Sequence, residues 1–188
     1  KHAEIVDELE KTWGKKIKPQ AVASVEESVI SVPSPVSGQL IDLNDVSDPT
    51  FASGKVGKGF AIKPTDGKVL APFDGTIKQI FNTRHAVGLV DKNGVALLIH
   101  IGFGTVAMRG TGFVSYISQG QKVKKGDELI EFWDPAIKKA GFDDTVVVVV
   151  TNYKHFGDFK FSLDPGTSVV SNEQNIMDIT LNSENKGE

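Results

Sequence analysis

Short apolar segments, separated by Gly, Pro, Asp and Asn, recur between Ser34 and Leu181 and constrain the fold most strongly. Apolar runs of roughly four to eight residues bounded by turn residues are typical of β-strands, whereas helices need longer stretches with a period near 3.6. We therefore expect an all-β fold. The expected strands are Ala61-Ile62, Val69-Leu70, Thr76–Phe81, Val87–Val90, Val95–Ile101, Val114–Ile117, Glu128–Phe132 and Thr145–Thr151.

One short helix is expected at Asp134 to Ala140. Asp134 is placed to cap its amino terminus, since a carboxylate can accept the free backbone N–H groups there. Pro135 suits the first turn, and Gly141 can end the helix in a left-handed conformation.

Two ten-residue segments repeat each other at an offset of 37 residues. Ser34–Leu43 aligns without a gap on Ala71–Ile80, and each begins small-Pro-apolar-polar-Gly before an alternating strand. Pro restricts φ and Gly permits a tight turn, so both segments use the same turn to enter a strand. The repeat predicts an antiparallel β-sandwich, or folded-over barrel, with internal pseudo-symmetry.

The first 33 residues differ from the rest of the chain. Ile5, Leu9 and Trp13 recur at four-residue spacing among acidic residues, which predicts a short amphipathic helix. Residues 14–33 are rich in Lys, Ser, Glu and Pro and indicate a flexible linker, with a helix packed on the domain as the alternative. The expected organisation is segment and linker 1–33, domain 34–182 and tail 183–188.

Composition excludes several classes of function. The absence of Cys among the 188 residues excludes disulfides, a cysteine nucleophile and a thiolate metal site. A net charge of −3 argues against a nucleic-acid partner, which normally meets a basic excess. The apolar run Val146 to Val150 is far shorter than the roughly 20 residues of a membrane span. We expect a soluble, intracellular chain without a cofactor.

Two motifs suggest chemistry that their contexts do not support. Gly54–Gly59 is glycine-rich like a phosphate-binding loop but lacks the Gly-Lys-Ser/Thr ending. Ala71–Gly75 and Gly126–Leu129 have the turns of biotinyl and lipoyl carriers. Those carriers need a lysine between hydrophobic neighbours such as Met, and neither Met108 nor Met177 flanks a lysine.

His85 and His100 lie on either side of Asn93-Gly94, a strong hairpin signal. A two-residue turn would pair Val87 with His100 and make the two imidazoles diagonal neighbours, whereas a four-residue loop would place His85 directly opposite His100. Both registers put the rings on one face, because side chains alternate with period two. Only an odd loop length would separate them.

Three interpretations of this histidine pair remain. The two rings can be polar residues on a solvated face, as we expect for His2 and His155. A hydrolytic zinc site needs a third ligand, and the sequence provides none at the expected spacing. The third is phosphoryl transfer, because a neutral imidazole is a competent nucleophile near pH 7. There Thr83 would orient the His85 ring, and the phosphoryl group would come from another protein.

The segments around the pair resemble the glucose-type IIA domain of the bacterial sugar phosphotransferase system. The similar segments are Gly57–Pro64, Val69–Ile77, Thr83–Ala86 and Leu98–Gly102. The family fold is an antiparallel β-sandwich. The resemblance implies that His100 is phosphorylated on Nε2 by the phosphocarrier protein HPr, that His85 stabilises the phosphoryl group, and that Thr83 hydrogen-bonds to His85.

The resemblance also implies a docking surface for HPr. It corresponds to a shallow apolar rim around the histidines, with the Gly102 carbonyl fixing the His100 tautomer and one acidic rim residue. The corresponding positions here are Phe51, Val56, Phe81, Gly102, Val106 and Asp48. The family's usual acidic residues near the active histidine are replaced by Ala96 and Gly104, which leaves fewer charges to orient a partner.

These departures, together with Arg109–Phe113 and Glu131–Gly141, resemble the C-terminal IIA-like domain of lactose/galactoside symporters of Gram-positive bacteria. Lys1–Val6 is similar to the stretch after their last transmembrane helix. The resemblance implies a regulatory phosphoryl carrier, not a turnover enzyme, on the cytoplasmic side of the membrane, with HPr and its own transporter as partners. The alternatives are a IIA unit that relays the phosphoryl group to a IIB domain and a pure interaction module.

Overall fold

The structure, a computed structural model, describes residues 28–182 and is built from antiparallel strands. Each expected strand segment contains a strand. The strands are β1 (Val29–Pro33), β2 (Gly38–Ile41), β3 (Lys58–Pro64), β4 (Lys68–Leu70), β5 (Gly75–Ile80), β6 (Ala86–Val90), β7 (Ala96–Phe103), β8 (Phe113–Ser115), β9 (Lys122–Val123), β10 (Glu128–Phe132), β11 (Asp143–Val150), β12 (Phe159–Phe161), β13 (Ser168–Val169) and β14 (Asn175–Thr180).

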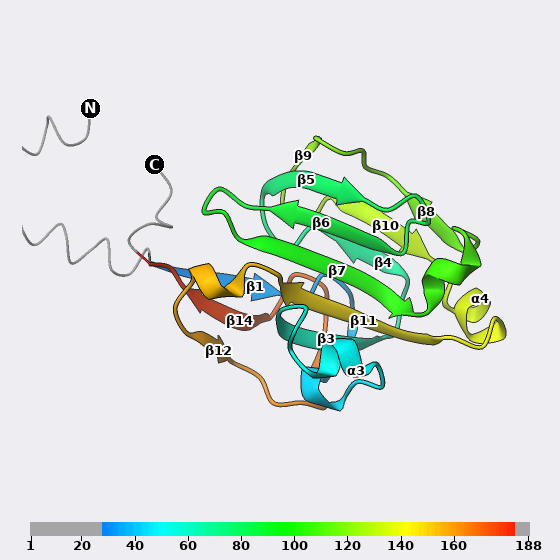
Figure 1. Cartoon of the computed structure of the whole chain (residues 1–188), viewed down its shortest axis with the longest axis horizontal. Coiled ribbons are helices and arrows are strands. Elements are labelled where there is room, and N and C mark those ends of the chain that lie inside the picture. Colours follow the sequence, from blue (N-terminus) through cyan, green and yellow to red (C-terminus); the bar gives the residue numbers. More distant parts are fainter. Residues whose placement is uncertain (1–27, 183–188) are drawn as a thin grey trace, which may run out of the picture.

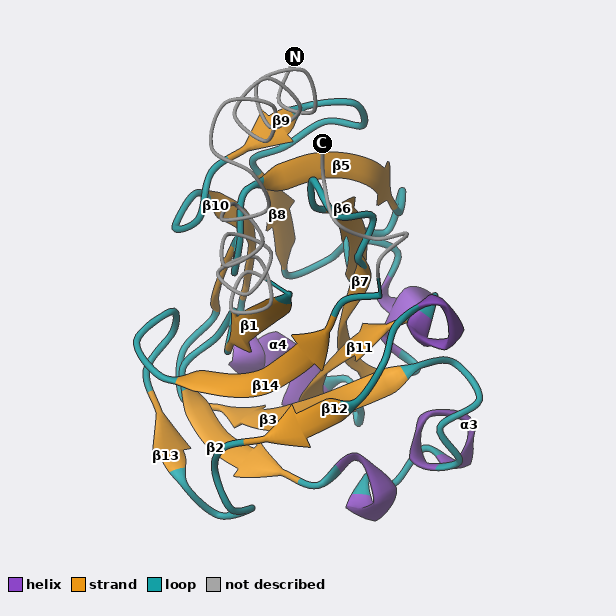
Figure 2. Cartoon of the chain, turned by 90° about the vertical axis from the view of Figure 1, so that its left-hand side faces the viewer, coloured by secondary structure: helices purple, strands orange, loops and turns teal. Residues whose placement is uncertain are grey.

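The strands form one large sheet and two small ones. The large sheet has eight strands in the order β13-β2-β3-β11-β7-β6-β5-β9. The small sheets have the orders β1-β14-β12 and β4-β10-β8. Figure 1 shows β6, β7 and β11 crossing the near face, and Figure 2 shows the large sheet curving from β5 and β9 round to β2 and β13. The expected folded-over, antiparallel all-β architecture is confirmed.

The internal repeat occupies symmetric positions in the large sheet. Gly38 begins β2 and Gly75 begins β5, which are the second strands from its two ends. The aligned residues Leu40 and Ile77 make the same contacts: Leu40 N–H donates to the Thr167 carbonyl, and Ile77 N–H donates to the Gln121 carbonyl, each at 2.8 Å. The repeated sequence therefore builds two matching halves, which meet at the central pair β11 and β7.

Asn172 joins the starts of the two repeats. Its backbone N–H donates to the carbonyl of Ser34 at 2.9 Å, and its side-chain Nδ2 donates to the carbonyl of Ala71 at 3.0 Å. Ser34 and Ala71 are the aligned first residues of the repeat. One residue thus ties both entry turns together.

β11 is buried on both faces, which explains its unbroken valine sequence. Val146, Val148 and Val150 pack into the main core between the sheets. Val147 and Val149 point the other way and form a second, smaller core. This small core, which also contains Leu43, Phe51 and Ala61, lies on the outer face of the large sheet.

The helical content is larger than expected. The predicted helix is present as α4 (Asp134–Lys139), but Trp133 occupies its N-cap, so the expectation that Asp134 caps it is wrong. Asp134 lies in the first turn, where its carboxylate pairs with Lys138 instead. The helical turns that were not predicted are η2 (Leu43–Asp45), α3 (Pro49–Ala52), η3 (Thr105–Met108) and η4 (Tyr153–His155).

The domain begins earlier than the expected boundary at residue 34. Val29–Pro33 forms β1, which pairs with β14 from Val29 opposite Thr180 onward. The linker assignment was therefore wrong for residues 29–33, where the β-branched run Val29-Ile30-Ser31-Val32 was an available strand signal. The expected helix around Ile5, Leu9 and Trp13, the rest of the linker and the tail 183–188 lie outside the described residues.

Candidate functional site

The hairpin of β6 and β7 carries the two histidines, and its register differs from both expected registers. Ala86 lies opposite His100, and Val90 lies opposite Ala96. The loop therefore spans Asp91–Val95, an odd number of residues, and the expected two-residue and four-residue loops are wrong.

The Asp91 side chain explains the longer loop. Its Oδ1 accepts hydrogen bonds from the backbone N–H groups of Asn93 and Val95, each at 2.9 Å. The Gly94 N–H also donates to the Asp91 carbonyl. Such a side-chain-closed turn competes with the tight hairpin turn that Asn-Gly favours.

The two rings nevertheless meet, because His85 lies just before the regular strand. Arg84 has a left-handed φ of 57°, which turns the chain before β6 begins. The side-chain alternation of a strand therefore does not extend to His85, although its carbonyl still accepts from the Ile101 N–H at 2.7 Å. The centroids of the His85 and His100 rings are 4.9 Å apart, with an interplanar angle of 86°.

Each ring has one nitrogen turned inward. Thr83 Oγ1 lies 2.6 Å from Nδ1 of His85. Nδ1 of His100 is buried and has no hydrogen bond of ordinary geometry within residues 28–182, although the Gly102 carbonyl close by favours the protonated ring. Nε2 is therefore the nitrogen that each ring has left for an incoming group.

Burial sets the charge state of both rings. Burial and the neighbouring His85 lower the pKa of His100 from 6.5 to about 4, against smaller opposing effects of the Gly102 carbonyl and Asp48. Burial also lowers the pKa of His85. Both imidazoles are thus neutral at pH 7, the form in which a ring nitrogen has a free lone pair.

A sharp corner in the chain follows the second histidine. Gly102 has a φ of 76° and Gly104 a φ of 78°, both in the left-handed region that glycine favours. A Cβ atom on Gly102 would overlap the Thr105 methyl group and lie 2.7 Å from the Asp143 carbonyl. The Thr105 hydroxyl closes the corner by donating to the Ile101 carbonyl.

Aromatic residues expected on the docking rim lie directly against the pair. The Phe51 ring centroid is 4.9 Å from that of His100, and the Phe81 centroid is 5.4 Å from that of His85. Phe103, which the sequence did not indicate, lies 5.8 Å from Phe51 and extends this surface. The signal that could have found Phe103 is its position directly after His100-Ile101-Gly102.

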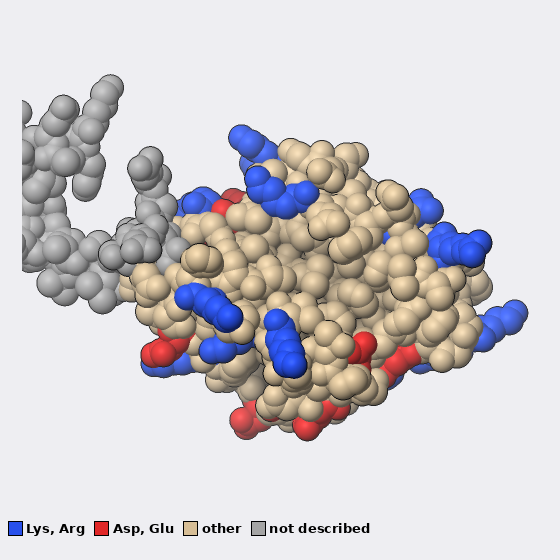
Figure 3. Space-filling view, viewed as in Figure 1, with Lys and Arg blue, Asp and Glu red and all other residues tan. Residues whose placement is uncertain are grey.

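The remaining rim positions lie on the elements beside the pair. Asp48 caps α3 by accepting hydrogen bonds from Thr50 and Phe51 N–H, and its charge acts on His100. Val56 is half-buried against the small core, and Val106 on η3 is 56% exposed. Figure 3 shows that the centre of this face carries few charged side chains, with Lys and Arg gathered toward its edges. A shallow, mostly uncharged surface thus surrounds the two rings.

The sequence matches the family described as the phosphoenolpyruvate-dependent sugar phosphotransferase system, EIIA 1, over residues 30–156. The chain belongs to this family. It is 44% identical over 146 residues to the glucose-specific EIIA component of Halalkalibacterium halodurans, covering 78% of this chain and 83% of that protein. The glucose permease IIA structure from Mycoplasma capricolum superposes with a TM-score of 0.68 at 30% identity, covering 80% of this chain and 95% of that one.

Permeases are also among the relatives of this EIIA domain. It is 55% identical over 181 residues to the raffinose carrier protein of Pediococcus pentosaceus, covering 95% of this chain and 28% of that protein. It is 49% identical over 169 residues to the lactose permease of Lactobacillus delbrueckii subsp. bulgaricus, covering 90% and 26%. The chain thus spans about a quarter of the length of these permeases and is an EIIA-like domain related to part of them.

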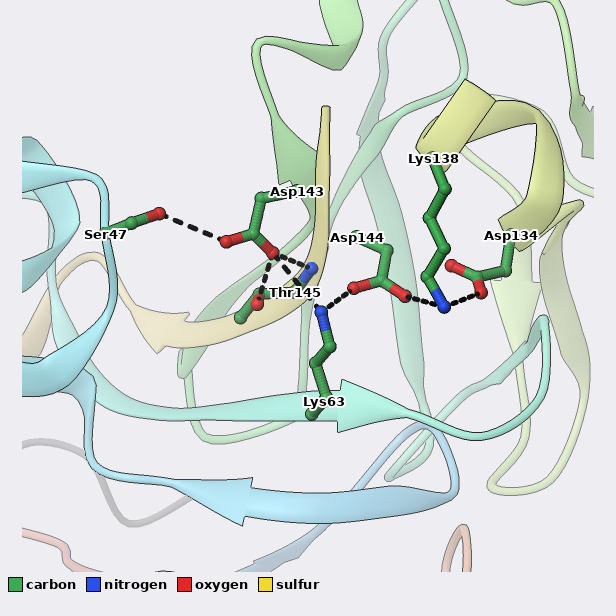
Figure 4. A network of polar contacts seen from close by, with 7 residues as sticks. All are labelled: Ser47, Lys63, Asp134, Lys138, Asp143, Asp144 and Thr145. Carbon is green, nitrogen blue, oxygen red and sulfur yellow. Dashed lines mark hydrogen bonds and ion pairs between the residues drawn. The ribbon is translucent and has the colours of Figure 1, made fainter. Parts of the chain in front are cut away.

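A network of polar and charged residues connects the α3 segment, which we define as residues 43–57, to β11 (Figure 4). Ser47 donates to the Asp143 carboxylate at 3.1 Å, and that carboxylate also accepts from the Thr145 N–H and hydroxyl. Lys63 bridges Asp143 and Asp144. Since Asp143 also lies opposite Phe103, the network connects Ser47 to the end of β7.

The far end of the network reaches α4. Lys138 pairs with Asp134 at 2.9 Å and with the second oxygen of Asp144 at 3.8 Å. The Asp144 side chain is fully buried, and burial followed by the nearby Asp134 raises its pKa. The sequence analysis missed this network, although the charged pair Asp143-Asp144 directly before a valine strand was an available signal.

Two further observations concern other kinds of site. Within residues 28–182, no group of three His, Asp or Glu side chains is arranged to hold a metal ion. No helix in the described part of the chain has the length and apolar character needed to cross a membrane. Family membership implies partners in phosphoryl transfer.

Proposed function

We propose that His100 accepts a phosphoryl group on Nε2 from the phosphohistidine of HPr. The observation that carries this proposal is the arrangement of two neutral imidazoles whose ring centroids are 4.9 Å apart. Thr83 contacts Nδ1 of His85, and Nδ1 of His100 is buried. A neutral ring is the nucleophilic form, and the low pKa of His100 keeps it neutral at pH 7.

In the proposed step, the Nε2 lone pair of His100 forms an N–P bond as the N–P bond of phosphorylated HPr breaks. The His100 proton stays on Nδ1, where the Gly102 carbonyl stabilises it. The Thr83 hydroxyl donates to Nδ1 of His85, which leaves the Nε2–H of His85 to donate to a phosphoryl oxygen. This hydrogen bond stabilises the negative charge of the phosphoryl oxygens, which would otherwise lie beside the buried rings without a partner.

HPr would dock on the rim formed by Phe51, Val56, Phe81 and Val106, with Asp48 at its edge. Phe51 and Phe81 contact the histidine rings directly, so a partner seated on them reaches both Nε2 atoms. An apolar centre with a polar margin is the usual anatomy of a protein interface.

The biological role that we propose is regulation of a sugar transporter by the phosphorylation state of His100. Relatives named raffinose carrier protein and lactose permease support this role, as does the replacement of acidic residues by Ala96 and Gly104. In this proposal residues 1–27 tether the domain to the transporter on the cytoplasmic side of the membrane, and lactose or a related galactoside is the transported sugar.

A second candidate is relay of the phosphoryl group to a IIB domain. The glucose-specific EIIA relative and the β-glucoside-specific EIIBCA component of Dickeya chrysanthemi, which is 46% identical over 123 residues, favour it. Both candidates use the same phosphohistidine, and they differ only in what happens after it forms.

The test incubates the 188-residue chain with phosphoenolpyruvate, enzyme I and HPr and measures acid-labile, base-stable phosphate. We expect label on the wild type and on His155→Ala, whose exposed ring lies on η4, and no label on His100→Ala. An unlabelled wild type would refute both candidates, and a labelled His100→Ala would refute the site. Addition of a IIB domain and sugar then separates the two: label retained on His100 supports regulation, and label lost to sugar supports relay.

A further inference from the structure

A groove of about 590 Å³ lies beside the α3 segment, outside the histidine site. Its lining comes from residues 40–44, the loop after α3, β3 and the segment around β12, and it includes four aromatic side chains. The lining residues used below are Asp42, Lys58, Tyr153, Phe159 and Phe161. Figure 1 shows the strands β3 and β12, with α3 next to β3.

The groove is mainly apolar inside and carries charges of both signs, with Asp42 and Lys58 among its lining residues. Phe161 is 50% exposed, a large value for a phenylalanine on a short edge strand. The Lys58 ammonium lies 5.4 Å from the Tyr153 ring centroid and 5.5 Å from that of Phe159. Lys55, Lys154 and Lys160 are exposed sequence neighbours of lining residues, and so are Asp45, Asp158 and Asp164. An amphipathic segment, with apolar side chains for the aromatic walls and an acidic one for Lys58, is therefore the chemistry that complements it.

The chain itself contains such a segment outside the described residues. Residues 1–13 carry Ile5, Leu9 and Trp13 at four-residue spacing. They also carry four acidic residues, Glu4, Asp7, Glu8 and Glu10, against two lysines. An isolated segment of this length is a marginal helix in water, so its apolar side chains need a surface to pack on.

The segment starts close enough to reach the groove. Val29 begins β1 opposite Thr180 of β14, and Phe159 begins β12 opposite Ile179 on the other side of β14. The two strands thus start at the same end of the sheet, about 10 Å apart across one intervening strand. Residues 14–28 can span up to about 50 Å when extended.

We propose that residues 1–13 dock in this groove, with Ile5, Leu9 and Trp13 on its aromatic walls and an acidic residue paired with Lys58. A short flexible connection gives an effective concentration on the order of millimolar, so even a weak intrinsic contact is populated. Ser53, Gly54 and Gly57, which line the groove, belong to the same loop as Val56 of the rim. The docked segment therefore contacts the loop that also borders the histidine site. The proposal does not depend on phosphotransfer.

Trp13 provides the test, because the chain has only two tryptophans. The background variant is Trp133→Phe, which removes the other one, a residue that is 67% exposed. We expect Trp13 in this chain to emit at shorter wavelength, and to be quenched by acrylamide less, than N-acetyltryptophanamide. Phe161→Asp and, separately, Leu9→Asp should raise the quenching constant about twofold or more as the docked fraction falls.

The controls make either result decisive. Val114→Asp changes an equally exposed apolar residue on β8, away from the groove, and should leave Trp13 protected. Leu9→Asp lies outside the described domain, so its result stands even if Phe161→Asp unfolds. The proposal is overturned if Trp13 is quenched like the free amide, or if both variants leave the quenching unchanged. It is also overturned if protection disappears on dilution, which would indicate docking into a second copy.

Discussion

Thr83 Oγ1 lies 2.6 Å from Nδ1 of His85, and this contact holds the ring that lies beside His100, with the two ring centroids 4.9 Å apart. Thr83 precedes the left-handed Arg84, so the turn that brings His85 out of the strand also brings its partner hydroxyl into place. The first prediction concerns this hydroxyl.

Thr83→Val removes the donor while keeping the shape of the side chain. We expect return of the phosphoryl group from His100 to HPr to slow about tenfold, because the His85 ring is free to turn. Single-turnover transfer to unphosphorylated HPr measures the effect. Thr83→Ser keeps the hydroxyl and should stay near the wild-type rate, and equal rates for the Val and Ser variants would contradict the assignment.

His85→Gln should still accept phosphate on His100 but pass it on poorly. Gln keeps an N–H donor but not the ring that Thr83 holds in position, and loss of one well-placed donor typically costs about 10²-fold in rate. The measurement is the ratio of forward labelling to reverse transfer in the presence of HPr. Unchanged reverse transfer would show that His85 does not stabilise the transferred group.

Gly102→Ala should destabilise the fold more than Gly94→Ala. Both glycines have a positive φ, 76° and 84°, which costs about 1–2 kcal/mol for a residue with a Cβ. At Gly94 no atom lies within 4 Å of the added Cβ, whereas at Gly102 it overlaps Thr105. Urea unfolding of the two variants measures the difference in the free energy of unfolding. Equal losses of stability would show that an added Cβ at Gly102 meets no more crowding than one at Gly94.

His100 should make the domain less stable in mild acid. Its pKa is about 4 in the folded state against 6.5 for a free histidine, so between these values the unfolded chain binds the proton first. The free energy of unfolding therefore falls as the pH decreases from about 6.5 to about 4, and this contribution is fully present above pH 6.5.

Urea titrations at a series of pH values test this dependence. His100→Gln removes the titrating ring and should flatten the slope over that interval, although His85, whose pKa is also lowered, keeps part of it. The matched control is His155→Gln, which removes an exposed histidine and should leave the wild-type slope. An identical slope for wild type and His100→Gln would contradict the low pKa.

Lys63→Met should destabilise the domain by about 2–4 kcal/mol, since it leaves the buried Asp144 carboxylate without its closest cation. Lys138→Met should cost less, because Lys138 is more exposed and its contact with Asp144 is longer. Combining Lys63→Met with Asp144→Asn should restore part of the loss. Denaturant unfolding measures all three, and a double variant no more stable than Lys63→Met would mean that the two residues do not act as a pair.

The sequence was a good guide where the physics is local. Apolar runs between turn residues predicted β3–β8, β10 and β11, and the ten-residue repeat predicted two matching halves, because both depend on side-chain alternation and turn residues a few positions apart. The expected strands did not include β1, β9 or β12–β14. The expected helix was also local, and only its cap was wrong. Trp133 precedes Asp134 at the cap, and the Asp134 carboxylate is taken by Lys138.

The sequence failed where two local signals competed. Asn93-Gly94 favours a tight turn, but the Asp91 carboxylate closes a longer one, and this change of loop length shifted the register of the whole hairpin. Strand alternation alone would then have separated His85 from His100. Their approach depends on the left-handed Arg84, a conformation with no signature in an arginine residue.

By itself the sequence determined the all-β class, the internal repeat, the segment of the chain that carries the histidine pair and the family resemblance. The tertiary structure alone decided which atoms meet: Phe51 on His100, Ser47 on Asp143, and Lys63 between Asp143 and Asp144. Those partners lie tens of residues apart. Their contacts arise only when the large sheet curves and the α3 segment packs on its outer face. The residues adjacent to each partner in the sequence therefore give no signal for these contacts.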